Sequence, residues 1–92
     1  MVIEEIVLKN KSGLQSKKAA VFIQKASNFK SKIWIEKDER KANAKSLLGL
    51  LSLGISEGSK VSLMAEGEDE KEAVKGLTKY LMSNSIDKSL KQ

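Results

Sequence analysis

The sequence predicts a two-layer α+β domain in which three helices cover one face of a mainly antiparallel four-stranded sheet. Segments with alternating apolar residues and segments with apolar residues at helical spacing follow one another in the order β-α-β-β-α-β-α. Such an order is typical of helices packed on one side of an antiparallel sheet. The chain has 92 residues and no proline, so we expect a single domain over residues 1–92, with a polar, frayed tail at 84–92.

The first two elements are a strand and a helix. Residues 2–9 are rich in apolar and β-branched side chains and predict the first strand. From Ser16 the apolar residues follow helical spacing, at Ala19, Phe22, Ile23 and Ala26. Ser27 and Asn28 end this pattern, so the first helix is expected between Ser16 and these residues.

A hairpin is predicted next. Ile33 and Ile35 alternate with polar or larger residues, which indicates a strand with one buried face. The polar run at 37–39 then turns the chain into a short segment at 40–43. These two segments form the second and third strands.

A fourth strand and a last helix complete the pattern. Residues 60–66 place Val61, Leu63 and Ala65 on one face of the strand, and Gly67 ends it. The acidic run at 68–70 supplies negative charge at the start of the last helix, where the helix dipole favours it. The apolar stripe of that helix comprises Ala73, Leu77 and Leu81.

A short leucine-rich helix is predicted between the hairpin and the fourth strand. Ser46 occupies the N-cap position, and Gly54 stands where a left-handed residue would end the helix. Its five leucines cover about 220° of the helix circumference, against about 100° for an ordinary buried stripe. Leu50 and Leu53 fall on one side, and the second group comprises Leu47, Leu48 and Leu51. The second group faces a partner or, alternatively, the core.

Composition excludes several function classes. There is no cysteine and no histidine, which removes disulfides, thiol and imidazole catalysis and the usual zinc ligand sets. We therefore expect no catalytic residues, no metal and no cofactor. The net charge of +5 admits an acidic partner, but one arginine and four aromatic residues disfavour nucleic acid. No stretch approaches the ~20 apolar residues that span a bilayer, so we expect a cytoplasmic, soluble protein without a membrane partner.

Several segments together resemble the HPr family, the histidine-containing phosphocarriers of the bacterial sugar phosphotransferase system. The segments that carry this resemblance are Gly13-Leu14, residues 19–26, residues 43–46, residues 52–54 and residues 67–70, at the family's spacing over about residues 3 to 82. The resemblance implies the HPr-like open-faced sandwich, with three helices on one face of the four-stranded sheet.

The phosphocarrier site of this family is degenerate here. Members that carry phosphate read Gly-Leu-His-Ala-Arg-Pro where this chain has Gln15, Ser16, Lys17 and Lys18 after Leu14. An amide nitrogen has no nucleophilicity comparable to that of imidazole, because its lone pair is delocalised. Phosphate transfer through a histidine is therefore excluded. Lys17 keeps the charge of the family's arginine but lacks its planar fork, which weakens contacts to phosphate.

The glutamine is similar to that of the Crh-like group within the family, the regulators of carbon catabolite repression. That resemblance implies phosphorylation of Ser46 by HPr kinase/phosphorylase and binding of the product to a repressor of the CcpA type. It also implies a partner-binding surface that comprises Lys17, Ala20, Ile23, Gln24, Lys45, Leu47, Leu48 and Leu51. A phosphate on Ser46 would stand at a helix start beside Lys45.

Plainer interpretations stay open for these residues. Ser46 can be an N-cap without any modification, and Gln15 can be a vestige without a role. Lys17 and Lys18 can be charges that solvent screens, or they can hold an anion or an acidic partner. For the whole chain, one alternative is a constitutive protein-interaction module that has lost both phosphorylation roles. Another is nucleic-acid binding through the basic surface.

Overall fold

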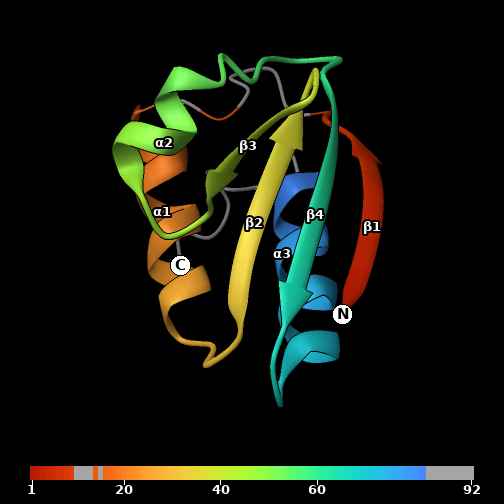
Figure 1. Ribbon diagram of the computed structural model, residues 1–92. Helices are drawn as coiled ribbons and strands as arrows, with labels where there is room; N and C mark the ends of the chain where they lie inside the picture. Colours follow the sequence, from red (N-terminus) through yellow and green to blue (C-terminus); the bar gives the residue numbers. More distant parts are fainter. Residues whose placement is uncertain (10–13, 15, 83–92) are drawn as a thin grey trace.

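The computed structural model describes residues 1–9, 14 and 16–82. Its elements follow the predicted order (Figure 1). The strands are β1 (Val2–Val7), β2 (Lys32–Lys37), β3 (Arg40–Asn43) and β4 (Lys60–Glu66), and the helices are α1 (Ser16–Ser27), α2 (Leu47–Ser52) and α3 (Glu70–Met82).

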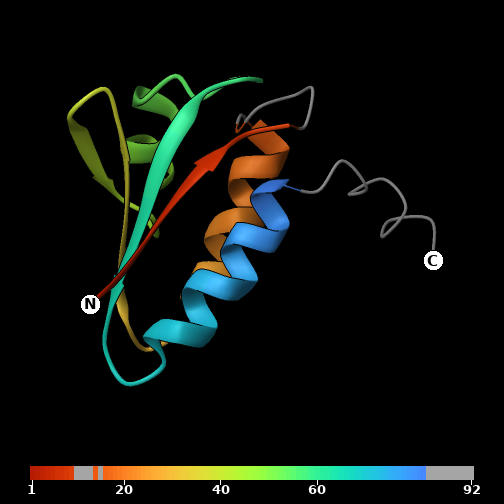
Figure 2. The same cartoon turned by 90° about the vertical axis from the view of Figure 1, so that its right-hand side faces the viewer.

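The four strands form one antiparallel sheet in the order β1-β4-β2-β3. β4 lies between β1 and β2, so that Ala65 of β4 is opposite Val2 of β1 on one side and opposite Ile33 of β2 on the other. Helices α1 and α3 lie together against one face, and the opposite face is open (Figure 2). Helix α2 lies near the β3 edge and contacts α1 and β3. The α+β fold predicted from the sequence, with its four-stranded antiparallel sheet and three helices, is thereby confirmed.

The core lies between the sheet and the helices. Alternate strand residues enter it, because successive side chains of a strand point to opposite faces. Its largest members include Phe22 of α1 and Leu77 of α3. The strand residues predicted to face inward are all buried, namely Ile33, Ile35, Val61, Leu63 and Ala65. The inward faces predicted for β2 and β4 are confirmed, and Met64 on the opposite face of β4 is buried as well.

The predicted hairpin joins β2 to β3 through a two-residue turn. Asp38 and Glu39 both have positive φ, 52° and 67°, which is the backbone twist that such tight hairpin turns require. The hairpin also reaches α2. The Arg40 guanidinium donates to the Ser52 carbonyl at 2.6 Å, and the Lys37 ammonium donates to the Gly54 carbonyl at 2.7 Å. These cations satisfy carbonyls at the end of α2, where positive charge is favourable.

Two boundaries differ from those predicted. β1 ends at Val7 instead of residue 9, although the Leu8 N–H still donates to the Ser59 carbonyl at 3.0 Å. α3 begins at Glu70, after a turn at Gly67 that passes very close to the start of β2. A Cβ on Gly67 would stand 2.7 Å from the Ser31 Cα, so this approach requires glycine.

Among the helices of the described residues, none combines the length and the apolar character that crossing a membrane requires. The tail predicted at 84–92 lies outside the described residues.

Candidate functional site

Ser46 caps the N-terminus of α2, as predicted. Its backbone is extended, with φ −114° and ψ 117°, and its Oγ accepts a hydrogen bond from the Gly49 N–H at 3.2 Å. Its carbonyl accepts the first helical bond, from the Leu50 N–H at 3.0 Å. Gly54 has φ 63° and ends the helix in the left-handed conformation, also as predicted. The half-buried Ser46 hydroxyl therefore has a defined structural role at the surface of the fold.

The two groups of leucines in and beside α2 have opposite environments. Leu50 is fully buried and Leu53 is 6% exposed. The second group is exposed, Leu47 by 45%, Leu48 by 81% and Leu51 by 42%. The alternative that the second group belongs to the core is therefore wrong, and an apolar surface follows.

Helix α1 adds further residues beside this surface. Lys17, Ala20 and Gln24 are exposed and recur at spacings of three and four, which places them on one stripe of the helix. Ile23 is half-buried and packs against the core. Because α1 and α2 are in contact, we name the apolar residues Ala20, Ile23, Leu47, Leu48 and Leu51 the α1–α2 patch.

The degenerate phosphocarrier site is described in part. Gln15 lies outside the described residues, whereas Ser16 begins α1 and Lys17 is exposed in its first turn. Lys18 is half-buried, and its carbonyl accepts a hydrogen bond from the Tyr80 hydroxyl at 3.4 Å. Burial raises the pKa of Tyr80 above its usual value, so this hydroxyl stays protonated as a donor. Lys18 thus connects α1 to α3.

Lys45, expected beside a phosphate on Ser46, points its ammonium elsewhere. The Nζ donates to the carbonyls of Phe29 at 2.9 Å and of Ser31 at 3.0 Å. β3 ends at Asn43, opposite Trp34, and the Ala44 N–H donates to the Ile33 carbonyl at 2.9 Å. The carbonyls of Phe29 and Ser31 come earlier in the chain than this last contact. The Lys45 side chain binds carbonyls there, which is a role in the fold.

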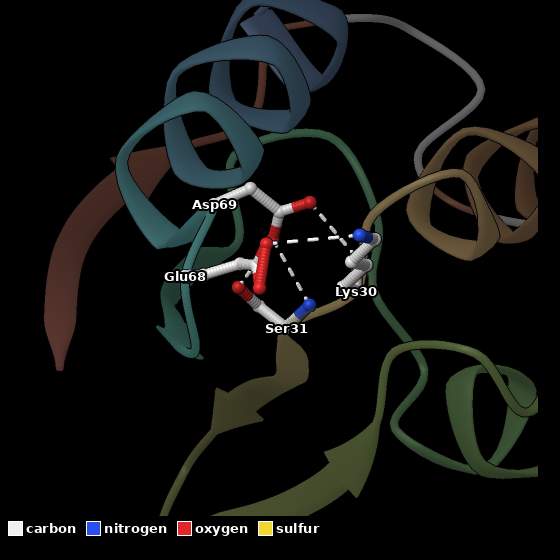
Figure 3. Close-up of polar contacts among 4 residues, drawn as sticks. All are labelled: Lys30, Ser31, Glu68 and Asp69. Carbon is white, nitrogen blue, oxygen red and sulfur yellow. Dashed lines mark hydrogen bonds and ion pairs between the residues drawn. The ribbon is translucent and has the colours of Figure 1, made fainter.

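A second polar cluster joins the start of β2 to the start of α3 (Figure 3). The Asp69 carboxylate accepts three hydrogen bonds, from the Lys30 N–H at 2.8 Å, the Ser31 N–H at 3.0 Å and the Ser31 hydroxyl at 2.5 Å. Glu68 adds an ion pair with Lys30 at 3.6 Å. We name the three bonds to Asp69 the Asp69 clasp. The Ser31 hydroxyl above all, and the Lys30 N–H, hold the pKa of Asp69 below its usual value.

Sequence reasoning missed the Asp69 clasp and the Lys45 contacts. It interpreted Asp69 as part of an acidic helix start, which is correct for its neighbour Glu70. Glu70 accepts from the Gly67 N–H at 3.1 Å, and this bond is the main reason that its pKa is lowered. No local signal distinguishes the two carboxylates, because the partners of Asp69 are 38 and 39 residues away in the chain.

The α1–α2 patch has the character of a binding surface. Over residues 1–9, 14 and 16–82 the structure holds no group of three or more acidic, histidine or cysteine side chains that could bind a metal. An exposed apolar patch bordered by lysine and glutamine is typical of a protein-binding surface.

Comparison with known proteins gives consistent results. Residues 2–83 match the family model described as PTS HPr component phosphorylation site. The HPr-like protein Crh of Bacillus subtilis is 47% identical over 81 residues, which are 88% of this chain and 95% of that protein.

Solved structures agree with the sequence matches. A crystal structure of HPr-C-His from Thermoanaerobacter tengcongensis has a TM-score of 0.88 and 51% identity, and the match covers 91% of this chain and 94% of that one. A crystal structure of Bacillus subtilis Crh has a TM-score of 0.74 and 45% identity over 91% of this chain and 97% of that one. The chain therefore belongs to the HPr family, as an HPr-like protein of the Crh type.

Proposed function

We propose that this chain is a non-catalytic regulator of carbon catabolite repression, switched by phosphorylation of Ser46 to bind a transcriptional repressor of the CcpA type. The observation that carries the proposal is the α1–α2 patch, which exposes three leucines directly after a serine hydroxyl at the surface. The Bacillus subtilis relative is described as a catabolite repression HPr, which supports the same role here. The expected setting is the cytoplasm.

Gln15 removes the competing role in this proposal. A chain without histidine has no imidazole that could accept a phosphoryl group, so phosphate transfer to sugars by the family's route is excluded. What remains is modification of Ser46 by an HPr kinase/phosphorylase. The phosphate would bring a charge of about −2 to the border of the α1–α2 patch.

Lys17 is the residue that we assign to the phosphate-bearing interface. It is exposed on α1, whereas the Lys45 ammonium is already bound to two carbonyls. A partner that contacts the α1–α2 patch would therefore meet Lys17 and Gln24 at its border. Lysine binds a phosphate as a point charge, without the bidentate geometry of arginine.

The first experiment tests the modification. The protein is incubated with HPr kinase/phosphorylase and ATP, and mass spectrometry locates the phosphate. We expect Ser46 to be labelled and Ser46→Ala to stay unlabelled, whereas Ser52→Ala, a control in the same helix, is labelled normally. An unmodified Ser46 under conditions that label Bacillus subtilis Crh would contradict the proposal.

The second experiment tests the surface. Binding to a CcpA-type repressor is measured by calorimetry for the phosphorylated protein, for Leu48→Asp and for the control Ile3→Asp. Leu48 and Ile3 are both exposed apolar residues, by 81% and 59%, but Ile3 is on β1. We expect Leu48→Asp to abolish binding and Ile3→Asp to preserve it. Equal binding of the unmodified and phosphorylated forms would instead indicate a constitutive interaction module.

The alternative of nucleic-acid binding is distinguished from protein binding by its salt dependence. Binding to phosphates weakens steeply as salt rises, because counterions are released. DNA or RNA affinity that is absent at low salt removes this alternative.

A further inference from the structure

A groove is lined by residues of the edge strand β1 and of helix α3. These two elements lie side by side toward the viewer in Figure 2. The groove encloses about 440 Å³, and its apolar lining includes Val2 of β1 and Val74 of α3. This groove involves neither α1 nor α2, so it is separate from the α1–α2 patch.

Three exposed lysines of α3 line the groove, at positions 71, 75 and 79. A spacing of four places them on one stripe of the helix, with a rise of about 6 Å from one lysine to the next. Alternate residues of an extended strand are about 6.6 Å apart. A strand that lies along α3 with an acidic residue at every second position would therefore meet each lysine in turn.

The backbone of β1 is available for pairing along the same line. β1 is the last strand on its side of the sheet formed by the described residues. The Leu8 N–H donates to the Ser59 carbonyl, so the even-numbered residues of β1 direct their backbone groups toward β4. Ile3, Glu5 and Val7 consequently direct their N–H and C=O groups away from the sheet, as an added strand requires.

The charges that line the groove favour a partner with negative charge. The ion pairs among the described residues are made by the N-terminus, Lys30 and Lys60, and by none of the three groove lysines. Glu4 is the acidic residue in the lining, so the lining carries three positive charges and one negative charge. A second copy paired along β1 would bring two lysine stripes together, which like-charge repulsion disfavours. An acidic segment is attracted by the positive lining and avoids the repulsion between two lysine stripes.

We propose that the β1–α3 groove binds an extended acidic segment of a partner protein, which adds to the free edge of β1 as a fifth strand. Carboxylates at alternate positions of that segment pair with Lys71, Lys75 and Lys79. The apolar side chains between them point to the other face of the sheet, where Ile3 and Val7 of β1 are exposed. This interaction is independent of Ser46 and of the α1–α2 patch.

The test uses a fluorescein-labelled peptide in which glutamate alternates with valine, and measures its binding to the full chain by fluorescence anisotropy. We expect saturable binding, with backbone amide shifts in NMR spectra that concentrate on Ile3, Glu5 and Val7. The variant K71Q/K75Q/K79Q is expected to bind about tenfold more weakly. The matched control K30Q/K32Q/K41Q removes the same charge from positions outside the groove lining, and should change the affinity by less than about twofold. Circular dichroism confirms that both variants are folded.

Two further probes separate strand addition from general attraction. A peptide of the same composition with its glutamates in one block should bind more weakly, because its carboxylates cannot follow the lysine spacing. A peptide methylated on alternate backbone nitrogens should lose binding, because it cannot donate to the edge of β1.

Several results would overturn the proposal. These are equal weakening by the two triple variants, amide shifts centred on α2, and no binding of the alternating peptide to the unmodified chain. Light scattering that shows a dimer unaffected by the peptide would assign the edge of β1 to a second copy, and would overturn the proposal as well.

Discussion

The α1–α2 patch and the Asp69 clasp use their residues in opposite ways. In the patch, Leu47, Leu48 and Leu51 expose apolar surface that contributes little to folding. In the clasp, the Asp69 carboxylate, just before α3, accepts three hydrogen bonds from the start of β2, where Ser31 is buried. The clasp connects segments that are far apart in the chain, so its role is to stabilise the fold. The patch contributes little to the fold, and the proposed function assigns it to a partner.

The largest expected effect contrasts two leucines of the same helix. Leu50→Ala removes a fully buried side chain and leaves a cavity, so it should lower the free energy of unfolding by about 3 kcal/mol. Leu48→Ala removes an exposed side chain and should change it by less than about 0.5 kcal/mol. Urea denaturation of both variants measures the difference. Similar losses would mean that the patch belongs to the core after all.

The second-largest expected effect comes from the clasp. Asp69→Ala leaves the Lys30 N–H, the Ser31 N–H and the Ser31 hydroxyl without their acceptor, so the melting temperature should fall clearly at neutral pH. The control Glu68→Ala removes an exposed ion pair and should change it little. Calorimetric melting of the two variants decides. An unchanged melting temperature in Asp69→Ala would show that the clasp does not stabilise the fold.

The clasp also predicts a pH dependence. The folded pKa of Asp69 lies below its ordinary value of 3.8, so the folded state binds fewer protons than the unfolded state in the acidic range. Its contribution to stability is therefore complete above that ordinary value and is lost as the pH falls through the folded pKa. The difference in stability between the unmodified chain and Asp69→Ala should shrink as the pH falls below 3.8. A difference that is constant with pH would contradict the lowered pKa.

The patch and the clasp differ as much in how well the sequence predicts them. The short helix is predictable from local signals, because Ser46, Gly54 and the leucine spacing are close together in the chain. Its periodicity separates the leucines into two groups, and the structure shows which group is buried. The order of the elements along the chain and the inward faces of β2 and β4 were likewise predictable. The clasp depends on Gly67 approaching Ser31, a contact between distant segments that no local pattern encodes. No local pattern predicts that the Lys45 ammonium binds the carbonyls of Phe29 and Ser31 either.

We expect Lys45, like the clasp, to contribute to the stability of the fold, unlike the exposed residues of the patch. Lys45→Met keeps the length of the side chain but removes the donor to two carbonyls, and should cost about 1.5 kcal/mol of unfolding free energy. The control Lys32→Met alters an exposed lysine at the start of β2 and should cost much less. Chemical denaturation tests both. A negligible cost for Lys45→Met would return this residue to the partner-binding surface.

Ser46 both stabilises the fold, as the cap of α2, and borders the patch. Its variants should give the smallest changes in the free energy of unfolding. Ser46→Ala removes the acceptor of the Gly49 N–H and should lower the free energy of unfolding by about 1 kcal/mol. Ser46→Asp keeps a capping oxygen and adds a negative charge, so its stability should stay within about 0.5 kcal/mol of the unmodified chain. If both variants lose stability equally, the cap does not tolerate a charge, and a phosphate on Ser46 would disrupt α2 instead of altering the surface beside the patch. Stability retained in Ser46→Asp alone would mean that the cap accepts a negative charge while the leucines stay where a partner can reach them.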